Sequence, residues 1–161
     1  ARDLKAICNH FYESVVLYVM GNHELYSRSG HSIQHVLDEI QSVEESCQNL
    51  RVLHNKQVEI DGVLFAGTPL WFRGDPLNEF YAKEINDFVF IKDFRAWVYD
   101  QNRLSEEFIR KVLASPRKPD VMITHYLPSA QCVTPKYQGS SINRFFVSPI
   151  ADEVSTLPRY W

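Results

Sequence analysis

Two short polar segments each follow directly on an apolar run. Residues 21–24, Gly-Asn-His-Glu, come after the β-branched and aromatic run 15–20. Residues 124–128, Thr-His-Tyr-Leu-Pro, come after the apolar run that ends at residue 123. Each segment therefore brings a histidine to the end of a predicted strand.

The side chains of Asn22, His23 and His125 have the chemistry of a metal-assisted phosphoester site. An imidazole such as that of His125 is a common ligand of divalent zinc, iron or manganese, and an amide oxygen such as that of Asn22 can also bind a hard cation. A second imidazole, that of His23, can reach a substrate oxygen and transfer a proton near neutral pH.

The elements that must position these groups are two parallel strands. The runs 15–20 and 121–123 are wholly apolar, which is typical of strands buried on both faces of a parallel sheet. Ligands of α/β sheets bind just beyond the carboxyl ends of the strands. We therefore expect adjacent parallel strands to bring Asn22, His23 and His125 to one rim, with Gly21 allowing the tight turn that leaves the first strand.

The rest of the chain alternates helix and strand patterns. Apolar residues at helical spacing predict helices over 3–13 and after Ser32, which can cap the second helix. Asp61-Gly62 predicts a hairpin between 57–60 and 63–67. The aromatic-rich stretch 68–104 reads as irregular core and lid packing with a short helix near 77–84. The alternation predicts an α/β fold.

The remaining signals are a helix, a loop and a strand start near the carboxyl end. Ser105 is expected to cap a helix that runs to about Ala114, before Pro116. Residues 128–149 are rich in Pro, Ser, Gly and Asn and predict a loop. Residues 159–161 resemble a strand that has just begun.

Composition narrows the class of protein. The 161 residues are 45% hydrophobic and 23% charged, which is typical of a globular domain. With 17 basic and 20 acidic residues the formal net charge is −3, so neither nucleic acid nor an acidic membrane is indicated as a partner. Three widely spaced cysteines, Cys8, Cys47 and Cys132, form no CxxC pair. They predict free thiols in a reducing, cytoplasmic compartment.

The two polar segments resemble motifs of the calcineurin-like metallophosphoesterases. Residues 18–24, Tyr-Val-Met-Gly-Asn-His-Glu, are similar to that family's GNH[DE] motif, and residues 121–128 are similar to its later strand-and-histidine segment. Residues 65–71 and 86–88 are similar to a bacterial and phage branch of the family. The resemblance covers most of residues 14–161. It implies the central portion of a sandwich of mixed β-sheets flanked by helices.

The resemblance also implies a reaction and a role for each site residue. It implies hydrolysis of a phosphate mono- or diester through a dinuclear centre of two divalent metal ions (manganese, iron, zinc or similar). Asn22 and His125 would bind the second metal. His23 would contact the phosphate and act as general acid to the leaving group, or stabilise the transition state.

The chain departs from the family pattern at both ends. The family opens with DxH and GDxxD motifs and closes with GHxH, and no DxH triplet occurs in this sequence. Residues 74–78 mimic GDxxD only loosely and lie downstream, whereas Gly30-His31 with His35 forms GHxxxH. We therefore expect residues 1–161 to form a single domain that is the incomplete middle of a longer enzyme. Alone, it should bind metal weakly and catalyse poorly.

Two other functions fit the sequence. Some proteins with this fold have lost their metal ligands, so a non-catalytic binding or scaffold module is an alternative. A thiol hydrolase that uses Cys132, seven residues after His125, is another. Neither alternative identifies the substrate, the metal or the oligomeric state.

Overall fold

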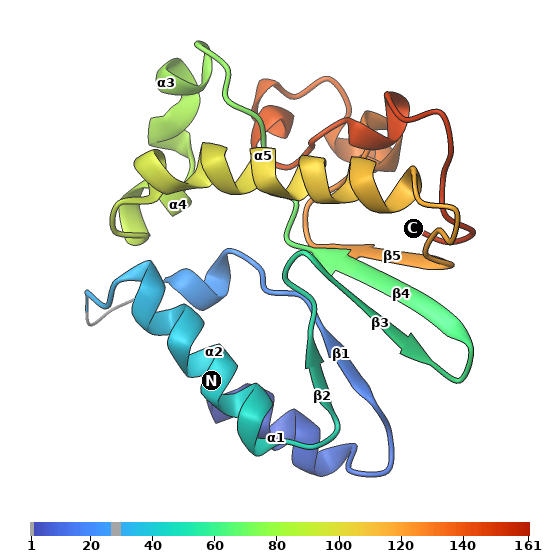
Figure 1. Cartoon of the computed structure of the whole chain (residues 1–161). Coiled ribbons are helices and arrows are strands. Elements are labelled where there is room, and N and C mark those ends of the chain that lie inside the picture. Colours follow the sequence, from blue (N-terminus) through green and yellow to red (C-terminus); the bar gives the residue numbers. More distant parts are fainter. Residues whose placement is uncertain (1, 27–29) are drawn as a thin grey trace.

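Helices and short strands alternate along residues 2–26 and 30–161, the part of the chain that the computed structural model describes (Figure 1). The fold is mixed α/β. Its α-helices and strands, in chain order, are α1 (Arg2–His10), β1 (Val16–Tyr18), α2 (Ile33–Ser46), β2 (Leu50–Val52), β3 (Lys56–Ile60), β4 (Val63–Thr68), α3 (Asn78–Tyr81), α4 (Asp87–Phe90), α5 (Phe94–Leu113) and β5 (Val121–Thr124).

The strands form two small sheets. In the first, β1 and β2 are parallel, with Val16 opposite Leu50. In the second, β4 pairs antiparallel with β3 and parallel with β5. The β3–β4 hairpin confirms the prediction from Asp61-Gly62, since both residues have the positive φ angles (50° and 82°) that such a two-residue turn requires.

The expectation that β1 and β5 are adjacent strands is wrong, because each belongs to a different sheet. The two sheets nevertheless approach closely at Gly67 on β4. A Cβ atom at this position would lie 2.6 Å from the Leu53 Cβ and 3.0 Å from a Val19 methyl group. The glycine thus lets the chain segments that follow β1 and β2 pack directly against β4.

The strands β1 and β5 are also less buried than their sequences predict. Val16–Tyr18 are only half-buried, Val15 is exposed, and Met122 is the fully buried residue of β5. The reason is their position in the sheets: β1 is paired with β2, and β5 is paired with β4 on one side, while on the other side Val121 makes an isolated parallel bridge to Tyr160 of the predicted strand start at residues 159–161. An apolar run therefore marks these strands without implying burial on both faces.

The prediction for helix α2 is confirmed for its N-terminal cap and for its buried apolar face. The Ser32 Oγ accepts a hydrogen bond from the His35 N–H at 3.2 Å, and the side chains of Ile33, Val36 and Ile40 are buried. Helices α1 and α2 lie beside β1 and β2 in the lower part of Figure 1. Residues 77–84 contain α3 and a following 3₁₀ turn, as expected.

Helix α5 is the largest departure from the predicted elements. It begins at Phe94 rather than at Ser105, and Ser105 lies inside it. The Ser105 hydroxyl is 2% exposed, donates to the Gln101 carbonyl at 2.8 Å, and accepts from the Thr68 hydroxyl at 2.8 Å. The buried face of α5 includes this serine and Asn102. These polar residues interrupt the apolar spacing from which a helix is predicted, so the amino-terminal part of α5 was not predicted.

The prediction of core packing for residues 68–104 is confirmed at Trp71, Phe72 and Phe94, although Phe80 and Phe90 are exposed. Phe72, which is fully buried, makes edge or tilted ring contacts with a group of aromatic side chains at centroid distances of 5.1–6.1 Å: Phe88, Phe94, Tyr99, Tyr126 and Phe145. Because these rings come from both sides of α5 in the sequence, they join the carboxyl-terminal segment to the rest of the core.

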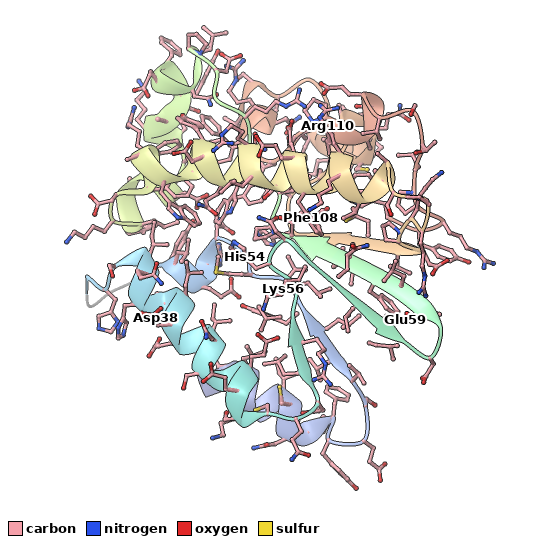
Figure 2. All side chains as sticks on the ribbon, in the orientation of Figure 1. Asp38, His54, Lys56, Glu59, Phe108 and Arg110 are labelled. Carbon is pink, nitrogen blue, oxygen red and sulfur yellow. The ribbon has the colours of Figure 1, made fainter. Side chains whose placement is uncertain are left out.

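An ionic network ties the carboxyl-terminal segment to α5. The Arg73 guanidinium pairs with Glu106 of α5 and with Glu153, and Arg110 of α5 reaches the same Glu153 at 2.7 Å. Figure 2 shows Arg110 on α5 near that segment. These arginines lower the pKa of Glu153 to about 2 through hydrogen bonds and charge, against the opposing effect of burial.

None of the helices in residues 2–26 and 30–161 combines the length and the apolar character that crossing a bilayer demands.

Candidate functional site

Asn22 and His125 meet although they lie 103 residues apart in the sequence. Asn22 starts a 3₁₀ turn, His23–Leu25, after the chain leaves β1, and His125 directly follows β5. The His125 Nε2 lies 3.1 Å from the Asn22 Oδ1. Glu24 stabilises the turn, because its carboxylate accepts a hydrogen bond from the Gly21 N–H at 2.9 Å.

A buried carboxylate fixes the orientation of the Asn22 amide. Asp87, which is 3% exposed, accepts a hydrogen bond from the Asn22 Nδ2 at 2.7 Å. It also accepts from the hydroxyls of Tyr26 and Tyr126, the latter at 3.2 Å. Because the amide nitrogen is committed to Asp87, the amide oxygen is the atom that faces His125.

Sequence reasoning missed the role of Asp87. The family resemblance includes residues 86–88 but predicts no site role for them. The available signal was the carboxylate at the start of the otherwise apolar run Asp-Phe-Val-Phe of α4, since a carboxylate that is buried, as Asp87 is, must be paired.

Gly21 lies against the face of the His125 ring. A Cβ atom at position 21 would be 2.6 Å from the ring Cε1 and 2.8 Å from Nε2. Real Cβ atoms essentially never approach so closely, so glycine is what allows the imidazole to sit beside the backbone of this turn. The glycine is thus required by this close approach rather than, as the sequence predicts, by the turn, because its φ angle is not positive.

His23 belongs to the same site but is held differently. Its ring stacks on Tyr26 with a centroid distance of 4.6 Å and an interplanar angle of 28°. Tyr26 in turn contacts Phe90 of α4 at 5.5 Å. The His23 side chain is exposed, which leaves it accessible to a ligand.

All three predicted site residues line one cavity of about 610 Å³, a volume in the range of small-molecule sites. The carboxyl-terminal segment after β5 supplies most of the remaining wall. The lining residues are Asn22, His23, His125, Tyr126, Leu127, Cys132, Val133, Thr134, Tyr137, Ser140, Ile142, Asn143 and Phe146.

The protein around the site favours a neutral His125. Although this side chain keeps solvent access, loss of surrounding water lowers its pKa, and the nearby His23 acts in the same direction against Glu24 and Asp87. Burial, together with Asp87, raises the pKa of Tyr26 and of Tyr126. Both tyrosines therefore remain protonated donors to Asp87, and His125 presents the neutral ring that metal ligation requires.

The donor set fits part of a metal site. The 3.1 Å between the His125 Nε2 and the Asn22 Oδ1 is a hydrogen-bond distance. Two ligands about 2.1 Å from one cation, at roughly a right angle, would lie about 3.0 Å apart, so the same two atoms could hold an ion without a large movement. Two neutral donors do not fill the coordination of a divalent ion. Within residues 2–26 and 30–161, no three or more His, Cys, Asp or Glu side chains form a metal-binding group.

The loose motif matches lie elsewhere. Asp75, of the segment that mimics GDxxD, pairs with Arg144 at 3.2 Å and lines a different cavity. The rings of His31 and His35 contact each other at 4.2 Å near the start of α2, away from the lining of the site. Neither segment supplies a further ligand to Asn22 and His125.

Cys132 lines the candidate cavity, and its side chain is exposed. In the described part of the chain it has no hydrogen bond to an imidazole, so the pairing that activates a thiol nucleophile is not formed.

No family model, characterised protein or solved structure matches the chain. A function is therefore inferred from the side chains around this cavity.

Proposed function

We propose that this chain carries part of the active site of a metal-dependent phosphoesterase, which hydrolyses a phosphate mono- or diester. The main support is the meeting of Asn22 Oδ1 and His125 Nε2 at 3.1 Å, with His23 lining the same cavity. The resemblance of residues 18–24 and 121–128 to the calcineurin-like metallophosphoesterases supports the same reaction. On this proposal the two sheets and their helices are the central portion of that family's sandwich of mixed sheets.

Asn22 and His125 would hold one of two divalent ions. Bound cations in such a centre supply positive charge for the phosphoryl oxygens and lower the pKa of a coordinated water. Asp87 contributes by holding the Asn22 amide so that its oxygen faces the ion. Because the Asn22 Oδ1 can only accept, the His125 Nε2 donates in their 3.1 Å contact; to bind an ion through Nε2, the neutral ring would carry its proton on Nδ1 instead.

His23 would act on the substrate rather than on the metal. Its ring is exposed, faces the cavity, and is stacked on Tyr26. An imidazole nitrogen of His23 can donate a proton to the leaving oxygen, or a hydrogen bond to the phosphoryl group as charge develops. Either role separates His23 from the ligands in a mutational test.

We expect His125→Ala to weaken metal binding and His23→Ala to leave it nearly intact. Mn²⁺ binding to the 161-residue chain is measured by paramagnetic broadening of amide resonances, which detects weak sites. Hydrolysis of p-nitrophenyl phosphate with Mn²⁺ is measured on a form of the protein that turns this substrate over, whether the 161-residue chain or a longer one. In that form, His23→Ala should lower the rate of hydrolysis by about 10²–10⁴-fold, because one proton-transfer group is lost.

The matched control is His35→Ala, which removes an exposed imidazole of α2 outside the cavity. It should change neither broadening nor turnover. Broadening that is centred away from residues 22 and 125, or that is equal in the wild type and His125→Ala, would refute the metal assignment. Loss of metal in His23→Ala would make this residue a ligand instead.

A non-catalytic binding module is the second candidate. It is favoured by one observation, the lack of a group of three or more His, Cys, Asp or Glu ligands in residues 2–26 and 30–161. A binding module would still take up a phosphate ester beside His23 but would not turn it over at saturating Mn²⁺. Turnover that depends on His23 decides for the enzyme.

A further inference from the structure

The walls of the candidate cavity combine rings with uncharged polar groups. Tyr137 and Phe146 are 55% and 43% exposed, so their rings offer accessible apolar surface. Thr134, Ser140 and Asn143 add hydroxyl and amide groups. Beyond the two imidazoles, the lining contains no Lys, Arg, Asp or Glu side chain among the described residues.

Charged side chains are close by but are kept out of this cavity. The neighbouring cavity of about 460 Å³ contains Arg73, Asp75 and Arg144. Its charges are already paired, since Arg144 binds Asp75 at 3.2 Å and Arg73 binds Glu106 and Glu153. A second anionic group on a substrate would therefore meet no Lys or Arg side chain in the lining itself, and the Lys136 ammonium beside it lies over the Tyr137 ring at 5.0 Å.

Backbone pairing holds the aromatic wall next to the site. The Leu127 N–H donates to the Phe146 carbonyl at 2.9 Å, and the Ser148 N–H donates to the Leu127 carbonyl at 2.9 Å. Phe146 is thus attached to the chain two residues after His125. Lys136 lies over the Tyr137 ring at 5.0 Å and occupies one of its faces, which leaves Phe146 as the better stacking surface.

We propose that this cavity receives the alcohol portion of the substrate and that this portion is uncharged and carries an aromatic ring. The inference rests on the proposed phosphoesterase function, with the phosphate placed beside His23 and His125. Ring stacking on Phe146 contributes the apolar contact, and the hydroxyls of Thr134 and Ser140 bind polar atoms at the ring edge. We expect phosphoserine and compounds with several phosphates to be poorer substrates, because the lining offers no charged side chain to their added charges.

Cys132 provides a direct readout of cavity occupancy. It is exposed and lines the cavity, whereas Cys8 and Cys47 are 1% and 7% exposed. The rate at which iodoacetamide alkylates Cys132, followed by mass spectrometry, therefore reports on ligands in the cavity. The probes are phenyl phosphate, O-phosphoserine, inorganic phosphate and benzyl alcohol, each titrated against the folded 161-residue chain.

We expect phenyl phosphate to protect Cys132 at a concentration at least about fivefold lower than O-phosphoserine or inorganic phosphate. Phe146→Ala should raise the phenyl phosphate concentration needed by at least about fivefold, and Phe146→Leu should do the same, because it keeps apolar bulk but loses the ring. Phe80→Ala removes a ring that is 67% exposed outside the cavity and should change nothing. Each variant is compared with its own alkylation rate without ligand.

The outcomes separate this inference from the proposed function. The aromatic preference is overturned if phenyl phosphate and O-phosphoserine protect Cys132 at equal concentrations, or if protection by phenyl phosphate is the same in the wild type and Phe146→Ala. This holds even if protection by both esters requires His125. Protection by benzyl alcohol that depends on Phe146, without any added effect of a phosphate group, supports the ring site. That result would contradict the placement of phosphate beside His23 and His125.

Discussion

At the scale of single residues, the site depends on one buried carboxylate, Asp87, that is not among the residues lining the candidate cavity. Asp87 receives three donors, from Asn22, Tyr26 and Tyr126, and these link α4 to the segments after β1 and β5. Hydrogen bonds to a charged acceptor are stronger than neutral ones, so Asp87 both stabilises the fold and orients the Asn22 amide. A merely structural residue would do only the first.

We expect Asp87→Ala to lower the free energy of unfolding by about 2–4 kcal/mol, because one buried and two half-buried donors lose their charged acceptor. Mn²⁺ affinity should also fall about 10–100-fold, as for other groups that orient a metal ligand. Urea unfolding and Mn²⁺ titration measure the two effects. Asp38→Ala, on the exposed face of α2, is the control. A folded Asp87→Ala chain with unchanged Mn²⁺ affinity would remove the positioning role.

Gly21 makes a prediction of a different kind, because its substitution adds atoms. A methyl group at 2.6 Å from His125 Cε1 must displace the ring, at a cost of about 1–3 kcal/mol. We expect Gly21→Ala to shift the His125 ring resonances and to reduce Mn²⁺ affinity about as much as His125→Ala does. Gly74→Ala is the matched control, since its added Cβ would lie no closer than 3.6 Å to Tyr99. Unshifted His125 resonances in Gly21→Ala would contradict the close approach.

At the scale of elements, local patterns predicted what local forces determine. The Ser32 cap, the stripe of α2 and the Asp61-Gly62 turn are decided within a few residues, and all three are observed. The start of helix α5 was predicted wrongly, because Asn102 and Ser105 are buried polar residues with hydrogen-bond partners 31–46 residues away. The meeting of Asn22 with Asp87 is equally non-local. Sequence therefore indicated the site's imidazoles but not the carboxylate behind them.

Asn102 stabilises a turn that the sequence alone does not favour. Leu70 and Trp71 are fully buried and have positive φ angles of 70° and 36°, which side-chain-bearing residues rarely adopt. The Asn102 amide donates to the carbonyls of both, at 2.8 and 3.2 Å, and Pro69 in the same turn accepts from the Tyr126 N–H. The turn thus connects α5 to the segment that carries His125.

We expect Asn102→Ala to lower the free energy of unfolding by about 2–4 kcal/mol, because buried carbonyls lose their donor. The amide resonance of Tyr126 should shift as the turn relaxes. Chemical denaturation and NMR measure these effects, with Gln41→Ala on exposed α2 surface as the control. A variant as stable as the control would show that the backbone holds this turn without Asn102.

At the scale of the whole molecule, the two sheets meet at a junction that strand patterns do not specify. Helix–strand alternation predicts the mixed α/β class, but the pairing of strands depends on long-range packing such as that of Leu53 against Gly67. His54, one residue further, hydrogen-bonds Gln101 of α5 and lies beside Lys56 (Figure 2). Burial is the main cause of its lowered pKa, and the Lys56 charge adds to it against the Gln101 hydrogen bond.

This lowered pKa makes the junction sensitive to acid. The unfolded chain, in which His54 has a pKa near 6.5, binds the proton more readily than the folded chain. Stability from neutral His54 is therefore complete above this pH and decreases as the pH falls through 6.5 towards the folded-state pKa, by at most about 1.4 kcal/mol per pH unit. Urea unfolding between pH 7.5 and 5.0 should show a shallower loss in His54→Gln than in the wild type. His10→Gln, at the exposed end of α1, should follow the wild type, and parallel curves for wild type and His54→Gln would contradict the assignment.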